Sequence, residues 1–274
     1  MGNKLGRRPK SAKGEGNCVG RLDNQTIAIT GGCGDIGQAT ARRLSGDGAR
    51  IILLDVFPRE TGEVLADQIA AAPTCRYLVC DVTKRDVVES TLKSLGRLDA
   101  VISNAAIVCP DPFTDIKEKD WQDQIGVNLT GSFNVAQTAA RLMLDQLPDA
   151  FGLRGRILFT SSWVQDMPFP GTCAYITTKG GLKMLAKVMA QELAAKGIRV
   201  NSVAPGLVMA GLTKQIYDRD ADFRIKATRA IPLGAFQAPE SVAAAFAFLC
   251  SHDSDYMTGA TILVDGGCTL VARE

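Results

Sequence analysis

From Thr26 onward, short apolar runs rich in β-branched residues alternate with longer stretches whose apolar residues recur at helical spacing. The pattern predicts strands at Thr26–Thr30, Arg50–Leu54, Arg76–Cys80, Ala100–Ser103, Arg156–Thr160, Arg199–Val203 and Thr261–Val264. It predicts helices at Ile36–Ser45, Thr61–Ala71, Arg85–Leu95, Trp121–Leu147, Tyr175–Lys196 and Glu240–Ser251. Strands that alternate with helices are typical of βαβ units, so we expect an α/β fold. Its form is a doubly wound, seven-stranded parallel sheet of the Rossmann type, with helices on both faces.

The first 20 residues break this pattern. They carry Lys and Arg among Gly, Ser and Asn with almost no apolar content, so we predict a disordered basic tail over residues 1–20. A solvated extension is favoured over an arm that binds nucleic acid or membrane. Residues 21–274 are long enough for one catalytic domain with a substantial core.

Composition narrows the class of protein. The net charge of +2 over 274 residues implies no nucleic-acid partner, and no apolar run approaches a membrane span. The N-terminus has no secretory signal pattern. Eight cysteines form no Cys-x-x-Cys pair, and His252 is the single histidine, so we expect no metal site. Unpaired thiols favour a reducing, cytoplasmic location.

A glycine-rich segment, Gly31-Gly32-Cys33-Gly34-Asp35-Ile36-Gly37, lies between the first predicted strand and the first predicted helix. Such a turn lets the backbone approach a pyrophosphate, and the helix that follows offers free N–H groups at its positive end. Tight turns also need glycine, so the signal depends on this position after the first strand.

Asp55 ends the second predicted strand, roughly 20 residues beyond the glycine turn. A carboxylate there can accept a hydrogen bond from an adenosine ribose and would repel a 2′-phosphate, which favours NAD over NADP. Asp35 adds a second negative charge nearby. The positive charges of Arg42, Arg43 and Arg59 favour NADP instead, although the first two arginines fall inside the predicted helix.

Tyr175 and Lys179 stand four residues apart, and Ser162 lies thirteen residues upstream of the tyrosine. Residues four apart share a helix face, and a cation beside a phenol lowers the pKa of the phenol. The phenol could then exchange a proton with a substrate oxygen that the Ser162 hydroxyl also binds. Each residue alone has an ordinary explanation: Ser162 as a helix cap, Lys179 as a surface cation.

Several motifs in this order resemble the short-chain dehydrogenase/reductase family over residues 22–267. The family pattern Thr-Gly-x-x-x-Gly-Ile-Gly matches Thr30–Gly37, with Asp35 in place of the middle glycine. Further matches are Asp81-Val82, Asn104-Ala105-Ala106, Asn128, the set Ser162, Tyr175 and Lys179, Pro205-Gly206, and Val264-Asp265-Gly266-Gly267.

The resemblance implies reversible hydride transfer between NAD and a secondary alcohol or its ketone. Tyr175 would be the general acid/base, Ser162 would hold the substrate oxygen, and Lys179 would lower the Tyr175 pKa and bind the nicotinamide ribose. Asn128 would position a water that links Lys179 to solvent. The cofactor residues that it implies are Gly31, Gly34, Asp35, Ile36, Asp55, Asp81, Val82, Asn104, Ala105, Tyr175, Lys179, Pro205, Gly206 and Val208.

One position departs from the family: Ala210 stands where a threonine commonly holds the nicotinamide carboxamide. Thr213 or the backbone of Val208 substitutes, or the contact is missing. Residues 207–235 form a long segment that we expect to be a mobile substrate lid. Apolar and aromatic residues of this lid face a second wall at Trp163, Val164, Gln165, Met167 and Phe169.

This mixture fits a sugar, a polyol or a cyclic alcohol. Alternatives are a 3-oxoacyl or other carbonyl reductase of the same family and a dinucleotide-binding regulatory protein without activity. The regulatory alternative is disfavoured because such proteins commonly lose the tyrosine or the lysine. By analogy with the family we expect a homotetramer or homodimer, built through the helices near 121–147 and 175–196.

Overall fold

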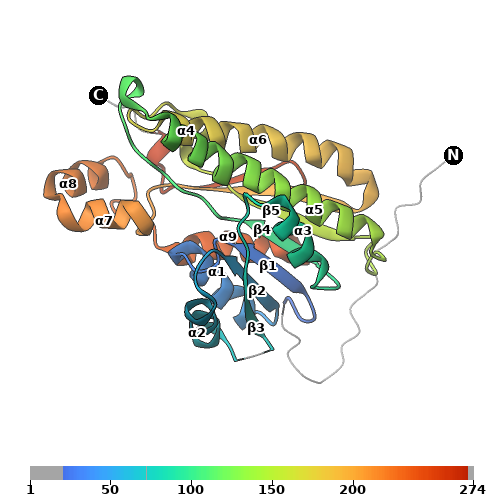
Figure 1. The fold of residues 1–274 in the computed structure, drawn as a ribbon. Helices are drawn as coiled ribbons and strands as arrows, with labels where there is room; N and C mark the ends of the chain where they lie inside the picture. Colours follow the sequence, from blue (N-terminus) through green and yellow to red (C-terminus); the bar gives the residue numbers. More distant parts are fainter. Residues whose placement is uncertain (1–20, 72, 271–274) are drawn as a thin grey trace.

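The computed structural model describes residues 21–71 and 73–270, and the predicted tail lies outside them. Its centre is a seven-stranded parallel sheet (Figure 1). The strands are β1 Thr26–Thr30, β2 Arg50–Asp55, β3 Cys75–Val79, β4 Ala100–Ser103, β5 Gly155–Thr160, β6 Ile198–Pro205 and β7 Thr261–Val264. All seven predicted strands are present, with ends shifted by at most two residues.

The strand order is β3-β2-β1-β4-β5-β6-β7. The chain first winds outward from β1 to β3 and then returns to start again at β4 beside β1. In a parallel sheet of this kind, a crevice forms at the carboxyl ends of the strands where the winding direction changes. The doubly wound Rossmann arrangement predicted from the sequence is therefore confirmed, and the β1–β4 boundary is where a ligand site is expected.

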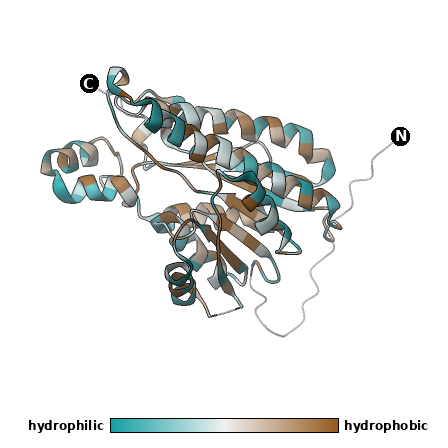
Figure 2. Ribbon diagram, viewed as in Figure 1, coloured by the Kyte–Doolittle hydropathy of each residue, from teal (hydrophilic) through white to brown (hydrophobic). Residues whose placement is uncertain are grey.

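Helices cover both faces of the sheet (Figure 1). One face carries α1 Asp35–Gly46, α2 Arg59–Ile69 and α9 Pro239–Cys250, and the other carries α3 Arg85–Lys93, α5 Ser132–Asp145 and α6 Cys173–Leu193. Figure 2 shows the strands as the most hydrophobic part of the molecule. Every residue of β1, β5 and β6 is buried, as expected of parallel strands covered on both sides.

Two predicted segments differ from the structure. The single helix expected at Trp121–Leu147 is α4 Glu118–Gln124, a π-helical turn at Ile125–Gly131, and then α5. The segment 207–235, expected as a loop, contains α7 Gly211–Arg219 and α8 Ala221–Arg229. Both helices are short and polar, so their apolar periodicity is weak. Short 3₁₀ helices lie at Phe113–Asp115, Trp163–Asp166, Ala194–Lys196, His252–Ser254 and Cys268–Leu270.

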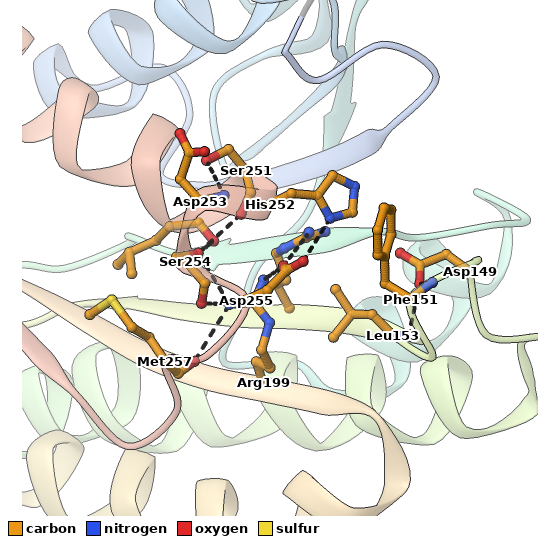
Figure 3. Close-up of polar contacts among 12 residues, drawn as sticks. Asp149, Phe151, Leu153, Arg199, Ser251, His252, Asp253, Ser254, Asp255 and Met257 are labelled. Atoms are coloured by element: carbon orange, nitrogen blue, oxygen red, sulfur yellow. Dashed lines mark hydrogen bonds and ion pairs between the residues drawn. The ribbon is translucent and has the colours of Figure 1, made fainter. Parts of the chain in front are cut away.

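A polar cluster with two buried arginines and a partly exposed aspartate anchors the amino-terminal ends of β5 and β6 (Figure 3). The second residues of these strands, Arg156 and Arg199, lie 3.6 and 3.2 Å from the same Asp255 oxygen. The other Asp255 oxygen is 3.0 Å from the His252 ring. Burial, helped by the charge of Arg156, lowers the pKa of Arg199 to about 10. The cluster ties the chain after α9 to the sheet, at the edge opposite the β1–β4 crevice.

No helix among the described residues combines the length and the apolar character needed to cross a membrane.

Candidate active site

The glycine turn joins β1 to α1 at the centre of the sheet. Gly31 has a φ of +60°, and a Cβ on it would lie 2.8 Å from the Cα of Ala105. A Cβ on Gly37 would lie 2.3 Å from the Gly31 carbonyl oxygen, so α1 could not pack this closely against the turn. Gly34 precedes α1, and no side chain caps the helix there. The first N–H groups of α1 are therefore available to an anion.

Asn104 and Thr30 tie three strand ends together. The Thr30 hydroxyl accepts hydrogen bonds from the backbone N–H groups of Asn104 (3.0 Å) and Ala105 (3.2 Å). The Asn104 amide donates to the Gly31 carbonyl at 3.1 Å and accepts from the Thr160 hydroxyl at 2.9 Å. The ends of β1, β4 and β5 are thus held in one fixed arrangement beside the glycine turn.

Asp55 lies at the end of β2, next to this turn. One carboxylate oxygen accepts from the Cys33 N–H at 2.9 Å, and the other accepts from the Val56 N–H at 2.8 Å. These two hydrogen bonds hold the carboxylate beside the glycine turn. This is the position from which the sequence analysis predicts that Asp55 contacts a ribose. Its fixed negative charge disfavours a phosphate group at the same place.

The end of β3 is followed by Asp81 and Val82. Asp81 accepts from the backbone N–H of Thr83 at 2.9 Å and from its hydroxyl at 2.7 Å, which forms a tight turn. Val82 is buried, and its carbonyl accepts from the Asn134 amide at 3.0 Å. This turn fixes the wall of the crevice beyond β2.

Pro205 ends β6, and Gly206 leads into the lid. The Gly206 N–H donates to the carbonyl of Val264 at 2.8 Å and to the side chain of Gln237 at 3.0 Å. A Cβ on Gly206 would lie 2.7 Å from the Cα of Asp265, so this crossing requires glycine. Val208 is buried and pairs with Gln237 in an isolated β-bridge.

The predicted catalytic side chains come from β5 and α6. Ser162 follows β5 and caps the 3₁₀ helix Trp163–Asp166, where its hydroxyl accepts from the Val164 N–H at 3.4 Å. The same hydroxyl is hydrogen-bonded to Tyr175. Lys179 lies one turn further along α6, and its Nζ is 5.3 Å from the Tyr175 ring centroid. The capping and active-site explanations of Ser162 are therefore compatible.

Lys179 is almost completely buried, and its Nζ donates to the carbonyl of Thr160 at 2.8 Å. Burial lowers the pKa of Lys179 to about 8. The pKa of Tyr175 is raised by burial, and its hydrogen bond to Ser162 offsets only part of this effect. Burial and Ser162 are the causes of the shifted Tyr175 pKa in this structure, so the role of Lys179 in lowering that pKa stays a prediction.

Asn128 is fully buried in the π-helical turn. Its amide oxygen accepts from the Ile107 N–H and its amide nitrogen donates to the Ile107 carbonyl, both at 2.8 Å. The nitrogen is also 3.3 Å from the Thr178 hydroxyl, in the turn between Tyr175 and Lys179. Asn128 therefore fastens the chain after β4 to α6, and its side chain is satisfied by protein groups.

One cavity of about 520 Å³ brings these residues together. Every predicted site residue lines it except Asn128, which lies behind its wall. The sequence analysis missed several lining residues: Val56, Phe57, Cys80, Ile107, Val108, Val127, Thr160 and Ser161. Val56, Cys80 and Ser161 directly neighbour a predicted residue at a strand end, which is a signal that could have identified these three.

None of the five residues predicted for the second wall, Trp163, Val164, Gln165, Met167 and Phe169, lines the cavity. Trp163 and Val164 do not line the cavity; they are buried against Ile231 and Cys268. Trp163 packs edge-on against Phe169, with ring centroids 5.9 Å apart. These side chains attach the lid region to the body because their large apolar surfaces are more stable buried than facing solvent.

The aromatic residues of the lid behave in the same way. The Tyr217 ring is 4.8 Å from the Phe236 ring, and the Phe223 ring is 6.2 Å from it. Leu212 and Thr213 line the cavity, together with Ala210. The lid therefore contributes its first residues to the site and packs its aromatic residues against Phe236.

The residues present fit a dinucleotide. A glycine cradle, an open helix N-terminus and a ribose-facing carboxylate surround a cavity at the β1–β4 boundary, with a hydrogen-bonded Ser–Tyr pair beside it. Within the described part of the chain, no cluster of His, Cys, Asp or Glu could hold a metal ion. The fold and the lining of the cavity thus fit a dinucleotide-binding protein.

Comparison with known proteins specifies the class further. A family model described as enoyl-(acyl carrier protein) reductase matches residues 33–269. A 3-oxoacyl-(acyl-carrier-protein) reductase of Thermotoga maritima is 35% identical over 254 residues, which cover 91% of this chain and 100% of that protein. A short-chain type dehydrogenase/reductase from Mycobacterium marinum is 33% identical with a TM-score of 0.81, covering 91% of this chain and 97% of that one.

A gluconate 5-dehydrogenase from Burkholderia cenocepacia, solved in complex with NADP and tartrate, is 31% identical with a TM-score of 0.85. The match covers 93% of this chain and 100% of that one. The chain belongs to the short-chain dehydrogenase/reductase family. It is therefore an oxidoreductase, and its family binds a nicotinamide dinucleotide.

The buried amine of Lys179 makes stability depend on pH. Its pKa is about 8 in the folded protein and 10.5 in the unfolded chain, so between these values the unfolded chain holds a proton that the folded protein has lost. The free energy of unfolding must then rise with pH. Relative to Lys179→Met, the wild-type protein should gain about 2 kcal/mol between about pH 7.5 and 9.5.

Urea denaturation of both proteins at the two pH values measures this gain. Other groups titrate equally in the two proteins and cancel in the comparison. A stability difference that does not change with pH would show that the Lys179 pKa is not lowered.

Proposed function

We propose that this protein catalyses reversible NAD-dependent oxidation of a secondary alcohol to its ketone. The alcohol would be a sugar, a polyol or a cyclic alcohol. The observation that carries the proposal is the arrangement of Ser162, Tyr175 and Lys179 along one wall of the cavity that the glycine turn and Asp55 also line. A proton-transfer group and a dinucleotide site in one cavity are what this reaction requires.

Each catalytic side chain has a role that its contacts support. Tyr175 would accept the alcohol proton in oxidation and return a proton in ketone reduction. Ser162, already hydrogen-bonded to Tyr175, would bind the same substrate oxygen and orient it. The bound nicotinamide supplies the two-electron chemistry of hydride transfer.

Lys179 would act as a cation when its amine remains protonated. Its Nζ makes one hydrogen bond, to the Thr160 carbonyl, and an ammonium carries three donors. Ribose hydroxyls that accept from the other donors would stabilise the ammonium and raise its pKa. Positive charge 5.3 Å from the Tyr175 ring would then favour the phenolate.

Asn128 has a positioning role in this proposal. Its amide is occupied by Ile107 and Thr178, so it would hold the cavity wall and the Tyr175 turn of α6 in register. The water-linked relay that the family resemblance implies stays a prediction.

The preference for NAD rests on Asp55, whose carboxylate is oriented by two backbone N–H groups. A 2′-phosphate at this position would meet a fixed negative charge. The gluconate 5-dehydrogenase structure contains NADP, so similarity to that protein does not favour NAD. The preference for NAD is therefore argued from this chain's own residues.

A second substrate class is a 3-oxoacyl thioester or another ketone in the reductive direction. The Thermotoga maritima relative, a 3-oxoacyl-(acyl-carrier-protein) reductase, supports this alternative. Apolar cavity residues such as Ile107, Val108 and Leu212 suit an acyl chain as well as a cyclic alcohol. Measuring the turnover of a panel of polyols, cyclic alcohols and 3-oxoacyl thioesters distinguishes the two substrate classes.

The proposal includes a cytoplasmic location and a homotetramer or homodimer. All cysteines in the described residues are free, which supports a reducing compartment. Apolar side chains are exposed on α5 (Phe133, Leu144) and on α6 (Met184, Val188). A second copy packed on these helices would cover them, and light scattering of the purified protein should give two or four times the chain mass. A monomer would remove this part of the proposal.

Replacing Tyr175 tests the chemistry. Tyr175→Phe keeps the ring and removes the hydroxyl, so kcat should fall at least about a hundredfold. The NADH dissociation constant, measured by nicotinamide fluorescence, should stay near the wild-type value because the cofactor contacts remain. Ile176→Val, one residue away on α6, is the control. Retained turnover in Tyr175→Phe would overturn the assignment.

Replacing Asp55 tests the cofactor preference. Asp55→Ala removes the charge that opposes a 2′-phosphate, so the ratio of kcat/KM for NADP to that for NAD should rise about tenfold, which corresponds to about 1.4 kcal/mol. The steady-state rate with each cofactor measures it. An unchanged ratio would show that Asp55 does not contact the ribose.

A further inference from the structure

Asp35 is the first residue of α1 and lines the cavity beside the glycine turn, yet it does not cap its own helix. Its Oδ2 instead accepts the backbone N–H of Gly211 at 2.8 Å, 176 residues away in the sequence. Gly211 is the first residue of α7, which opens the helical part of the lid. The hydrogen bond therefore joins the turn proposed to hold the cofactor to the lid.

Gly211 has the geometry of a hinge. Its φ is +48°, in the left-handed region that other residues rarely adopt, and a Cβ there would meet no neighbouring atom. The preceding residue, Ala210, has no side chain that could cap α7. Helix N-termini leave N–H groups unpaired unless an acceptor is supplied, and Asp35 supplies one from another part of the chain.

Two departures from the family pattern thus meet at one contact. Asp35 stands where the family has glycine, and Ala210 stands where it commonly has threonine. The first brings an acceptor to the start of α7, and the second removes a local hydroxyl from the same place.

Ile231 holds the far end of the lid to the body, whereas α7 and α8 have few attachments of their own. No residue of α7 is buried, and Ala227 is the one buried residue of α8. The two helices project from the body beside α9 (Figure 1). Tyr217 and Phe223 contact Phe236, which itself packs against the buried cluster around Trp163, so these rings hold the far side of the lid and leave the start of α7 to the Asp35 bond. A single hydrogen bond at the hinge can therefore change how often the lid opens.

We propose that Asp35 is a positioning residue that latches α7 to the cofactor turn through Gly211 and so slows both lid opening and cofactor release. The role in cofactor release rests on the proposed function, whereas the restraint on α7 does not. The side-chain oxygen is the essential feature, because it accepts the Gly211 N–H; the negative charge is not.

Two neutral variants separate the acceptor from the charge. Asp35→Asn keeps an oxygen in the same place, and Asp35→Ala removes it. Amide hydrogen exchange of a peptide covering Gly211–Arg219 should be about fivefold faster in Asp35→Ala than in Asp35→Asn, the scale of a lost helix cap. Asp35→Asn should exchange as slowly as the wild-type protein. A peptide from α9 and the variant Asp67→Ala, which removes an exposed charge on α2, should show no change.

Release of NADH, followed by stopped-flow fluorescence, should also be about fivefold faster in Asp35→Ala than in Asp35→Asn. Equal exchange of α7 in these two variants would overturn the latch, as would wild-type exchange in Asp35→Ala. If the wild-type protein binds no NADH, the proposed cofactor fails, while the exchange comparison still decides whether Asp35 restrains α7.

Discussion

The meeting of three strand ends at Thr30, Asn104 and Thr160 is the constraint on which the site depends. Asn104 bonds to the glycine turn on one side and to the Thr160 hydroxyl on the other. The backbone carbonyl of the same Thr160 accepts a hydrogen bond from the buried amine of Lys179. The groups proposed to bind the cofactor and those proposed to move a proton are therefore connected through two residues. A shift of any one strand end would misplace both sets, since bond-forming distances tolerate little error.

Burial determines the electrostatics of the catalytic wall. Lys179 lies in the core with a lowered pKa, and Tyr175 has a raised one, so neither group is at its ordinary value. The buried amine of Lys179 is unfavourable for folding when it is protonated, because the charged form loses solvation. Active sites commonly contain such groups, and a bound ligand that offers acceptors to the amine changes the balance. The proton-transfer group thus depends on what occupies the cavity.

The chain is similar to relatives named for different substrates, a 3-oxoacyl-(acyl-carrier-protein) reductase and a gluconate 5-dehydrogenase. In this chain the strand-end network and the Ser–Tyr–Lys set follow the family pattern, whereas Asp35 and Ala210 depart from it. Ala210 lies at the start of the lid, and Asp35 reaches the same place from α1 through its bond to Gly211. Variation at the edge of a rigid site is a physically simple way to change which ligand stays bound, because few residues of α7 and α8 are buried in the core.

The sequence by itself determined the sheet, the doubly wound order and the glycine turn, because buried strands and tight turns are encoded by residues close together in the chain. The family resemblance of its motifs also grouped Asp55, Ser162, Tyr175 and Lys179 in one predicted site, and all four line the same cavity. Only the tertiary structure decided the helices α7 and α8, the burial of Trp163 and the partners of Asn128. It likewise decided the direction of the Tyr175 pKa and the bond from Asp35 to Gly211. These features depend on burial depth and on contacts between distant segments, which no local pattern records.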